Sequence, residues 1–559
     1  MVGSKPTPNP GTAQQPPMVY GYQHQNGVFG SISQTYNNPN PSTSNVNSNS
    51  LYGSSVMALF PSEDVLVGDA SGCLKNNVAC NSGALFYFIP NSPVLSTNTA
   101  SDMAIPTLTS LTKNGQSIPG PNNMGAAVSG GGMHDIIVAS NGGFKFNTIP
   151  SQNPYHGAIS VYMNSPQQSA QPYYIYGQAF NGNTPDENTA TPTKIYYIGK
   201  AIAAADTYVA ASWTRSSSAS FDPTTGNQYD TEVSPDCVHI WQYTNANTQP
   251  ALDITTYKEM CDPDFNSAAP RRSSFGQAIA MTENFMAIGA FNAVSSSDAT
   301  KSPGKVYFYD RPNFVDNGWT PIPAITLESP AITQAVPPLD EVPAPTNNPT
   351  KFGYSLAMSK PTVDGSQAGV CFTIAIGAPS AVSTPDTTGF SKGSVYIYTL
   401  LNLNGYKWKM TNNLPYQVIS PIICFGEMIG NGPNLAMTMV QSKVLLAVGM
   451  PYDKSEAGSV AVYSTVSTDS TAQTWVTTPS ATFPPSSPAP PSNPPSAPSD
   501  NGSTSGGSKT TVTIVVVVVV VLLAAGGGYW YYNRQKTASA SAAAAATTGG
   551  DVKNPAHRI

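Results

Sequence analysis

Charged residues are scarce in this sequence, and they form no basic cluster. Only 10% of the 559 residues are Asp, Glu, Lys or Arg, and the formal net charge is −6. Surfaces that bind nucleic acids depend on clustered Lys and Arg side chains that neutralise phosphates. We therefore expect no nucleic-acid partner.

The sequence also lacks the short motifs of the common enzyme classes. It contains no GxSxG motif, no HExxH pair and no phosphate-binding P-loop. The five histidines are scattered, and His134 beside Asp135 is the pair that best fits an acid and a base. We interpret that pair as structural and predict that the protein is not an enzyme. A hydrolase without these motifs is the alternative.

Cysteines are few, and their spacing gives little support to metal chemistry. None belongs to a CxxC motif or lies near a histidine at the usual zinc spacing. An even number suits three disulfides in an oxidising compartment, and six free thiols are the alternative. Proximity in the sequence favours three pairs, Cys73 with Cys80, Cys237 with Cys261, and Cys371 with Cys424.

Proline, glycine and tyrosine are abundant instead. The chain contains 51 Pro, 46 Gly and 28 Tyr residues. Gly and Pro mark turns, and Tyr favours the half-buried surface of a sheet. This composition predicts an all-β protein with many loops.

One pattern of three short apolar segments recurs along the chain. It is clearest in "FGYSLAM", "FTIAIGAP" and "GSVYIY", and each segment is typical of a strand. Units with this outline begin about every 75 residues, at Tyr52, Met124, Ile198, Phe275, Phe352 and Phe425. A weaker fourth segment often carries a tryptophan, as at Trp319, Trp408 and Trp475.

Repeated four-stranded units predict a β-propeller. A four-stranded sheet cannot bury both of its faces alone, and radial stacking of such sheets gives a propeller. Gly at the second position of the first segment and Gly in "IGAP" suit close backbone packing near the crowded axis. The alternative is two or three β-sandwiches, which would not repeat the same ordered triplet six times.

These motifs resemble the FG-GAP repeat, the unit of the integrin α-subunit N-terminal β-propeller family. The resemblance covers residues 18–480 and is closest in the units that begin at Phe275, Phe352 and Phe425. It implies a seven-bladed propeller with a role in adhesion or ligand recognition.

The segment from Met18 resembles the third and fourth strands of a unit without the first two. Six full units and this half unit together make the seven blades that are usual in the family. No signal peptide is visible in the polar residues 1–17. We expect the missing half blade and a signal peptide to lie upstream of Met1. The alternative is that the two N-terminal strands close the ring.

The family often carries a calcium loop, D-x-D-x-D-G-x-x-D, between the first and second strands. Calcium needs several oxygen ligands in one turn, and the corresponding loops here supply no three spaced carboxylates. Asp364 followed by Gly365 is the nearest remnant. The "DPDFN" stretch of residues 262–266 lies before the FG strand, and we interpret it as a turn. We therefore expect no metal ion and no cofactor.

The C-terminal part predicts a membrane anchor. Residues 510–532 form an uncharged, Val-rich run that ends in Trp and Tyr residues, which is typical of one transmembrane helix. Residues 481–509 form a Pro/Ser-rich stalk with a glycosylation sequon at Asn501, and residues 533–559 form a short low-complexity tail. Arg534 and Lys536 follow the run, so we expect a cytoplasmic C-terminus and a large extracellular part.

The connections between second and third strands are long in most units. In the family these connections share one face of the propeller, and that face meets partners. The longest connection here, between residues 213 and 236, contains four candidate anchor residues, Trp213, Arg215, Phe221 and Tyr229. The alternative is that these side chains pack the loop onto itself.

The sequence as a whole predicts a single-pass surface protein. Its propeller is expected to bind an extracellular protein or a glycan. A structural protein of an algal-type wall or coat is the first alternative, and a propeller-borne hydrolase is the second.

Overall fold

The structure is a computed structural model, and it describes the strands of the chain with some of their connections. The chain divides into two compact units, Met1–Ser487 and Pro488–Ile559, and all the described residues lie in the first. The described residues are 2–3, 18–25, 28–37, 52–58, 65–69, 84–88, 111–113, 116–118, 124–131, 136–141, 158–162, 173–176, 179–181, 184–185, 194–205, 208–215, 235–246, 249–252, 257–266, 273–298, 301–311, 319, 323–330, 350–359, 369–381, 393–402, 405–410, 414–419, 435–440, 443–450, 459–465, 475–476, 479 and 481–483.

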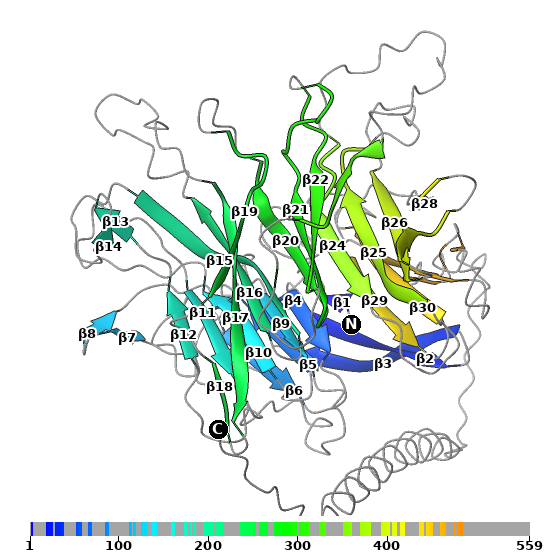
Figure 1. Cartoon of the computed structure of the whole chain (residues 1–559). Coiled ribbons are helices and arrows are strands. Elements are labelled where there is room, and N and C mark those ends of the chain that lie inside the picture. The colour runs from blue at the N-terminus through cyan, green and yellow to red at the C-terminus, as the bar shows by residue number, and fades with distance from the viewer. Residues whose placement is uncertain are drawn as a thin grey trace, which may run out of the picture. The chain divides into compact units, whose positions relative to one another are not determined.

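The described chain is all-β, and its sheets have a β-propeller arrangement (Figure 1). Five sheets contain four or more strands, and we number them as blades 1 to 5 in chain order. Blade 1 consists of β9 (Met124–Gly131), β10 (Ile136–Asn141), β11 (Ala158–Tyr162) and β12 (Tyr173–Tyr176). Blade 2 consists of β13 (Ala179–Asn181), β14 (Thr184–Pro185), β15 (Lys194–Ala204), β16 (Tyr208–Arg215), β17 (Cys237–Ala246), β18 (Gln249–Leu252) and β19 (Lys258–Cys261).

The remaining three blades follow the same antiparallel order. Blade 3 consists of β20 (Phe275–Met281), β21 (Phe285–Ala290), β22 (Lys305–Asp310) and β23 (Ile325–Glu328). Blade 4 consists of β24 (Ser355–Ser359), β25 (Val370–Ala378), β26 (Ser394–Asn402), β27 (Tyr406–Trp408) and β28 (Tyr416–Ile419). Blade 5 consists of β29 (Leu435–Val440), β30 (Lys443–Met450), β31 (Ser459–Ser464) and β32 (Ala481–Phe483).

Two smaller sheets and a hairpin precede these blades in the sequence. One sheet has three strands, β1 (Val2–Gly3), β2 (Met18–Gln25) and β3 (Val28–Asn37). The other has β4 (Tyr52–Ala58), β5 (Val65–Asp69) and β6 (Ala84–Phe88). The hairpin pairs β7 (Leu111–Lys113) with β8 (Gln116–Ile118).

The prediction of seven blades is wrong for the described chain, which has five. The unit that begins at Tyr52 forms a sheet of three strands, because no fourth strand is described beside β6. The segment from Met18 was expected to be half a blade, and it pairs with β1 in a separate three-stranded sheet.

The predicted order of strands is confirmed in the units that begin at Tyr52, Met124, Ile198, Phe275 and Phe352. In the unit that begins at Phe425 the first strand of the blade is β29, ten residues after the predicted start. Tyr52, Met124 and Phe275 begin the first strands β4, β9 and β20. Phe425 lies outside the described residues. The predicted tryptophan in the fourth strand is confirmed in blade 4, where Trp408 ends β27. It is not confirmed for the other two, because Trp319 lies before β23 and Trp475 forms an isolated bridge with Thr465.

The core lies between consecutive sheets. Separate clusters of buried residues join blade 1 to blade 2, blade 2 to blade 3, blade 3 to blade 4, and blade 4 to blade 5. Between blades 3 and 4, the rings of Phe308 and Phe372 stack with their centroids 5.6 Å apart. Blades 2, 3 and 4 are therefore each packed on both faces by their neighbours, as the repeat pattern predicts.

Close backbone contacts between glycines bring the inner strands of neighbouring blades together. A Cβ atom added to Gly289 in β21 would collide with the carbonyl oxygen of Gly353 in the next unit. Gly353 itself has a φ angle of 88°, which L-residues with a side chain rarely adopt. Gly68 in β5 faces Gly125 in β9 in the same way. These residues are the repeated glycines that the sequence singles out.

The predicted stalk, anchor and tail lie outside the described residues, as does Asn501. Within the described part of the chain, no helix is both long enough and apolar enough to cross a membrane.

We expect Gly289→Ala to destabilise the propeller by about 3 kcal/mol, because the added methyl group meets backbone that cannot move without shifting a blade. Gly405→Ala is the matched control, since Gly405 has a positive φ but no neighbour within 4 Å. The control should cost about 1 kcal/mol through backbone strain alone. Denaturant unfolding followed by tryptophan fluorescence measures both. Equal losses would contradict the role given to this contact.

Candidate functional site

The connections at the two ends of the blades differ in length. In each of the five blades, the connection from the second to the third strand is longer than the one from the first to the second. In blade 2 these three strands are β15, β16 and β17. In blade 2, for example, β15 ends at Ala204 and β16 begins at Tyr208, whereas β16 ends at Arg215 and β17 begins at Cys237. Because the strands are antiparallel, the two kinds of connection leave from opposite ends of the blade.

The four candidate anchor residues do not form one exposed loop. Trp213 lies within β16 and is buried, with 7% of its surface exposed. Arg215 is the last residue of β16, opposite Tyr196 of β15. Phe221 and Tyr229 lie outside the described residues. The expectation that Trp213 is a surface anchor is therefore corrected. Its alternating position in the strand turns it toward the core between blades 1 and 2.

Trp213 is part of a ladder of rings on the face of blade 2 turned toward blade 1. The His239 ring is stacked on Trp213 with centroids 4.4 Å apart, and also on Tyr257 with centroids 4.2 Å apart. Trp241 contacts both His239 and Tyr257. Trp213 and Trp241 are buried, whereas Tyr257 is 49% exposed. The ladder therefore runs from the core to the solvent.

The strand register explains why these side chains share one face. Cys237 lies opposite Cys261, and His239 lies opposite Glu259, across the antiparallel pair β17 and β19. Residues two apart in a strand point to the same side. The sequence "CVH" and the sequence "EMC" therefore place two cysteines, a histidine and a glutamate next to one another.

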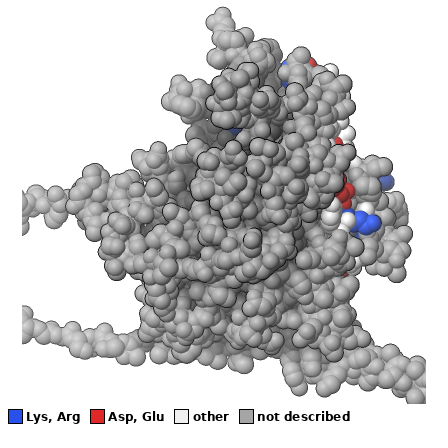
Figure 2. All heavy atoms as spheres, turned by 90° about the vertical axis from the view of Figure 1, so that its left-hand side faces the viewer, with Lys and Arg blue, Asp and Glu red and all other residues white. Residues whose placement is uncertain are grey.

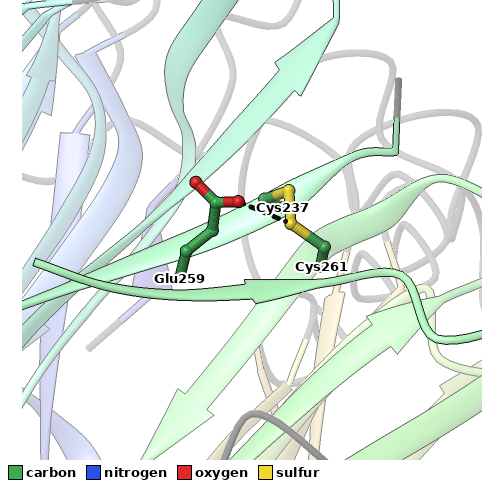
Figure 3. A group of neighbouring side chains, drawn as sticks. All are labelled: Cys237, Glu259 and Cys261. Carbon is green, nitrogen blue, oxygen red and sulfur yellow. Dashed lines mark hydrogen bonds between the residues drawn. A yellow bond between two sulfur atoms is a disulfide. The ribbon is translucent and has the colours of Figure 1, made fainter. Parts of the chain in front are cut away.

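A disulfide joins Cys237 to Cys261, which is one of the three pairings that the sequence favours (Figure 3). Cys371 carries a free, half-buried thiol, so the expected pairing of Cys371 with Cys424 is wrong. Cys371 lies in β25, within the sheet of blade 4, and its burial raises the pKa of its thiol. Cys73, Cys80 and Cys424 lie outside the described residues.

Glu259 connects the disulfide to the ring ladder. One of its carboxylate oxygens lies 3.0 Å from His239 Nε2, and the other lies 3.0 Å from Cys261 Sγ (Figure 3). A sulfur in a disulfide has no hydrogen, so the second approach is a close contact and becomes a hydrogen bond only when Cys261 is a thiol. The hydrogen bond with His239 lowers the pKa of Glu259, against the opposing effect of partial burial.

The His239 side chain is buried, and one of its two ring nitrogens can still form a further hydrogen bond. The residue is 2% exposed, and no atom of the described chain forms a hydrogen bond with its Nδ1. Its Nε2 faces Glu259, whose side chain is 48% exposed. The group thus combines buried nitrogen and sulfur atoms with a carboxylate that solvent reaches.

The "DPDFN" stretch forms a turn, as predicted. The Asp264 backbone N–H donates to Asp262 Oδ1 at 3.0 Å, and Ser273 Oγ donates to Asp262 Oδ2 at 2.5 Å. Asp264 Oδ2 accepts hydrogen bonds from Lys305 Nζ and from Tyr307, both in β22 of blade 3. The buried Lys305 ammonium supplies the positive charge next to these carboxylates, and the turn fastens blade 2 to blade 3.

Charges of both signs occur near one another on the described surface. Figure 2 shows acidic and basic atoms side by side at the right-hand edge of the view. In the part of the chain drawn in colour, this view contains no broad patch of one sign. A nucleic-acid partner stays unexpected on the grounds of composition.

The chain matches no family model, and no curated protein matches it in sequence.

The sequence analysis does not predict the places of His239, Tyr257 and Glu259. No cysteine lies near a histidine at the usual zinc spacing in the linear sequence, so these residues show no relation there. The signal that could have found them is the alternation in "CVH" and "EMC", combined with the pairing of Cys237 and Cys261. That signal becomes usable only when the two strands are known to be neighbours.

We expect replacement of both disulfide cysteines by serine to destabilise the oxidised protein by about 3 kcal/mol. The bridge closes a loop over a sequence separation of 24, and its loss restores freedom to the unfolded chain. The control is Cys371→Ser, which breaks no bridge and should cost less than about 1 kcal/mol. Equilibrium unfolding in denaturant checks both, and an undiminished stability of the double variant would contradict the prediction.

The raised pKa of Asp262 predicts that the stability of the protein depends on pH. Burial raises the pKa of Asp262 in the folded protein, although the bond from Ser273 opposes this effect. The folded state therefore holds a proton more tightly than the unfolded state, and Asp262 contributes less to stability as the pH rises above about 3.9. We expect Asp262→Asn to gain stability relative to the natural protein between pH 4 and pH 7. Denaturant unfolding across this range measures the difference, and a difference that does not change with pH would refute the assignment.

Proposed function

We propose that this protein is a single-pass surface protein whose propeller recognises an extracellular protein or a glycan. One observation carries the proposal, namely that in every blade the connection from the second to the third strand is longer than the connection from the first to the second. A rigid scaffold that gathers long connections at one end is the arrangement that binding loops need. The first-to-second connections leave from the opposite end and are shorter, although the connections from β22 to β23 and from β31 to β32 also lie at that end.

The proposed relation to the FG-GAP repeat family has two structural supports. The repeated glycines lie where consecutive blades approach most closely, as at Gly289 and Gly353. The first three segments of the unit form three consecutive antiparallel strands in blades 1 to 4. We infer a common architecture from these features, and an adhesive or recognition role from the family resemblance.

The membrane anchor is proposed from the sequence. Residues 510–532 have the length and apolar character of a spanning helix, and the Pro/Ser-rich residues 481–509 would hold the propeller away from the bilayer. With the tail of residues 533–559 in the cytoplasm, the propeller faces the outside. A disulfide in blade 2 agrees with an oxidising compartment.

The connection between β16 and β17 is the strongest candidate for contact with the ligand. It is the longest of the second-to-third connections, and it carries Phe221 and Tyr229. Arg215 and Cys237 bound it, and the disulfide fixes the strand in which it ends. Aromatic and Arg residues on a fixed base are typical of the anchors of binding surfaces.

A cell-aggregation assay tests the proposal. The full chain is displayed on cells that do not otherwise aggregate, and one variant replaces residues 216–234 with a short Gly/Ser linker. We expect the variant to lose at least tenfold in aggregation or in binding to a glycan array, with unchanged surface staining of unpermeabilised cells. Trp213 is retained because it belongs to the core.

The matched control shortens residues 360–368, which join β24 to β25 at the opposite end of blade 4. This variant should bind as well as the natural protein. Equal binding by all three proteins would refute the assignment of the binding end. Absence of surface staining would refute the proposed location. Turnover of a glycan or an ester by the displayed protein would favour the hydrolase instead.

A further inference from the structure

Blade 2 carries four metal-binding side chains on one face of two neighbouring strands. Cys237 and His239 come from β17, and Glu259 and Cys261 come from β19. They form two directly opposed pairs, one of cysteines and one of histidine with glutamate. This arrangement is independent of the connections on which the proposed function rests.

The possible ligand atoms are already close together. One atom each from Cys237, Glu259 and Cys261 lies within 4.8 Å of the other two. The second oxygen of Glu259 lies 3.0 Å from His239 Nε2, so the histidine holds the carboxylate beside the sulfurs. Ligands of a zinc ion lie about 2.0 to 2.3 Å from the metal, which is compatible with three atoms at these separations.

We propose that reduction of the Cys237–Cys261 disulfide converts this group into a zinc site. A dithiol reductant reduces the disulfide through two thiol–disulfide exchanges. The products are two protein thiols and an oxidised, cyclic reductant. Zn²⁺ then displaces the two thiol protons and binds both thiolates together with a Glu259 oxygen. No electron moves in this second step, since the two protons go to solvent or buffer.

The donor set suits zinc. Two thiolates and a carboxylate match the borderline character of Zn²⁺, whereas calcium and magnesium prefer oxygen ligands alone. Three protein ligands leave one tetrahedral position for water. His239 acts as a positioning residue that orients Glu259, as carboxylate–histidine pairs commonly do around zinc.

Access to the site comes from the outer strand. Glu259 is exposed and Cys261 is half-buried, whereas Cys237 and His239 are buried. A reductant can therefore reach Cys261 first, and the thiol released from Cys237 stays on the inner side. The rings of Trp213 and Tyr257 both stack on the ring of His239, which limits movement of the imidazole.

The zinc site would keep the same two strands joined under reducing conditions. The disulfide ties β17 to β19 in an oxidising compartment, and the metal ties the same residues when the bond is open. Cys237 is also the first residue after the long connection from Arg215. The base of that connection therefore stays fixed in both redox states.

Cobalt uptake by the full chain tests the proposal. The detergent-solubilised protein is reduced with a dithiol, separated from the reductant in the absence of air, and titrated with Co²⁺. Charge-transfer bands of the bound Co²⁺ report thiolate ligands, and its visible bands report tetrahedral geometry. We expect the reduced natural protein to take up one more Co²⁺ than the oxidised protein, and Zn²⁺ to displace it. Replacement of both Cys237 and Cys261 by serine should abolish this extra equivalent.

Three further variants separate the site from other thiols and from misfolding. Cys371→Ser should leave the extra equivalent unchanged. Glu259→Ala and His239→Gln keep both cysteines and should weaken zinc binding by about 10- to 100-fold. Circular dichroism before metal addition shows whether each variant is folded. The same uptake and spectrum in the natural protein and in the double serine variant, or undiminished affinity in Glu259→Ala, would overturn the proposal.

Discussion

The approach of glycine to glycine between neighbouring blades is the constraint on which the structure depends. Where Gly289 meets Gly353, the added volume of one methyl group would collide with a backbone carbonyl. Sheets that approach this closely bury the apolar faces of both partners, and the separate core clusters lie between them. A wider spacing would leave these faces poorly packed, because dispersion contacts weaken steeply with distance.

Polar contacts within and between blades add to this apolar packing. The turn of Asp262 and Asp264 fastens blade 2 to Lys305 and Tyr307 of blade 3, where the buried ammonium is matched by carboxylate. On the other face of blade 2, the disulfide holds the outermost strand β19 against β17. A covalent bond thus joins two strands within blade 2, and a contact between opposite charges joins blade 2 to blade 3. Blade 2 also carries the longest of the second-to-third connections, so these ties lie at the base of the proposed binding loop.

The two proposals place different demands on blade 2. Recognition uses the chain between Arg215 and Cys237, and depends on strands that do not move. The zinc site uses the residues just beyond that connection, and depends on thiols that can be released. The two are compatible because either bond holds β17 and β19 together.

The sequence by itself determined the all-β class, the order of strands in each unit and the positions of the glycines, because these depend on local patterns that repeat. It also indicated the pairing of Cys237 with Cys261. It did not determine the number of blades, since a weak fourth strand has no strong local signal. Only the tertiary structure decided that Trp213 is buried and that Cys237, His239, Glu259 and Cys261 share one face. Those facts depend on which strands are neighbours and in which register, and β19 pairs with β17 although β18 lies between them in the sequence.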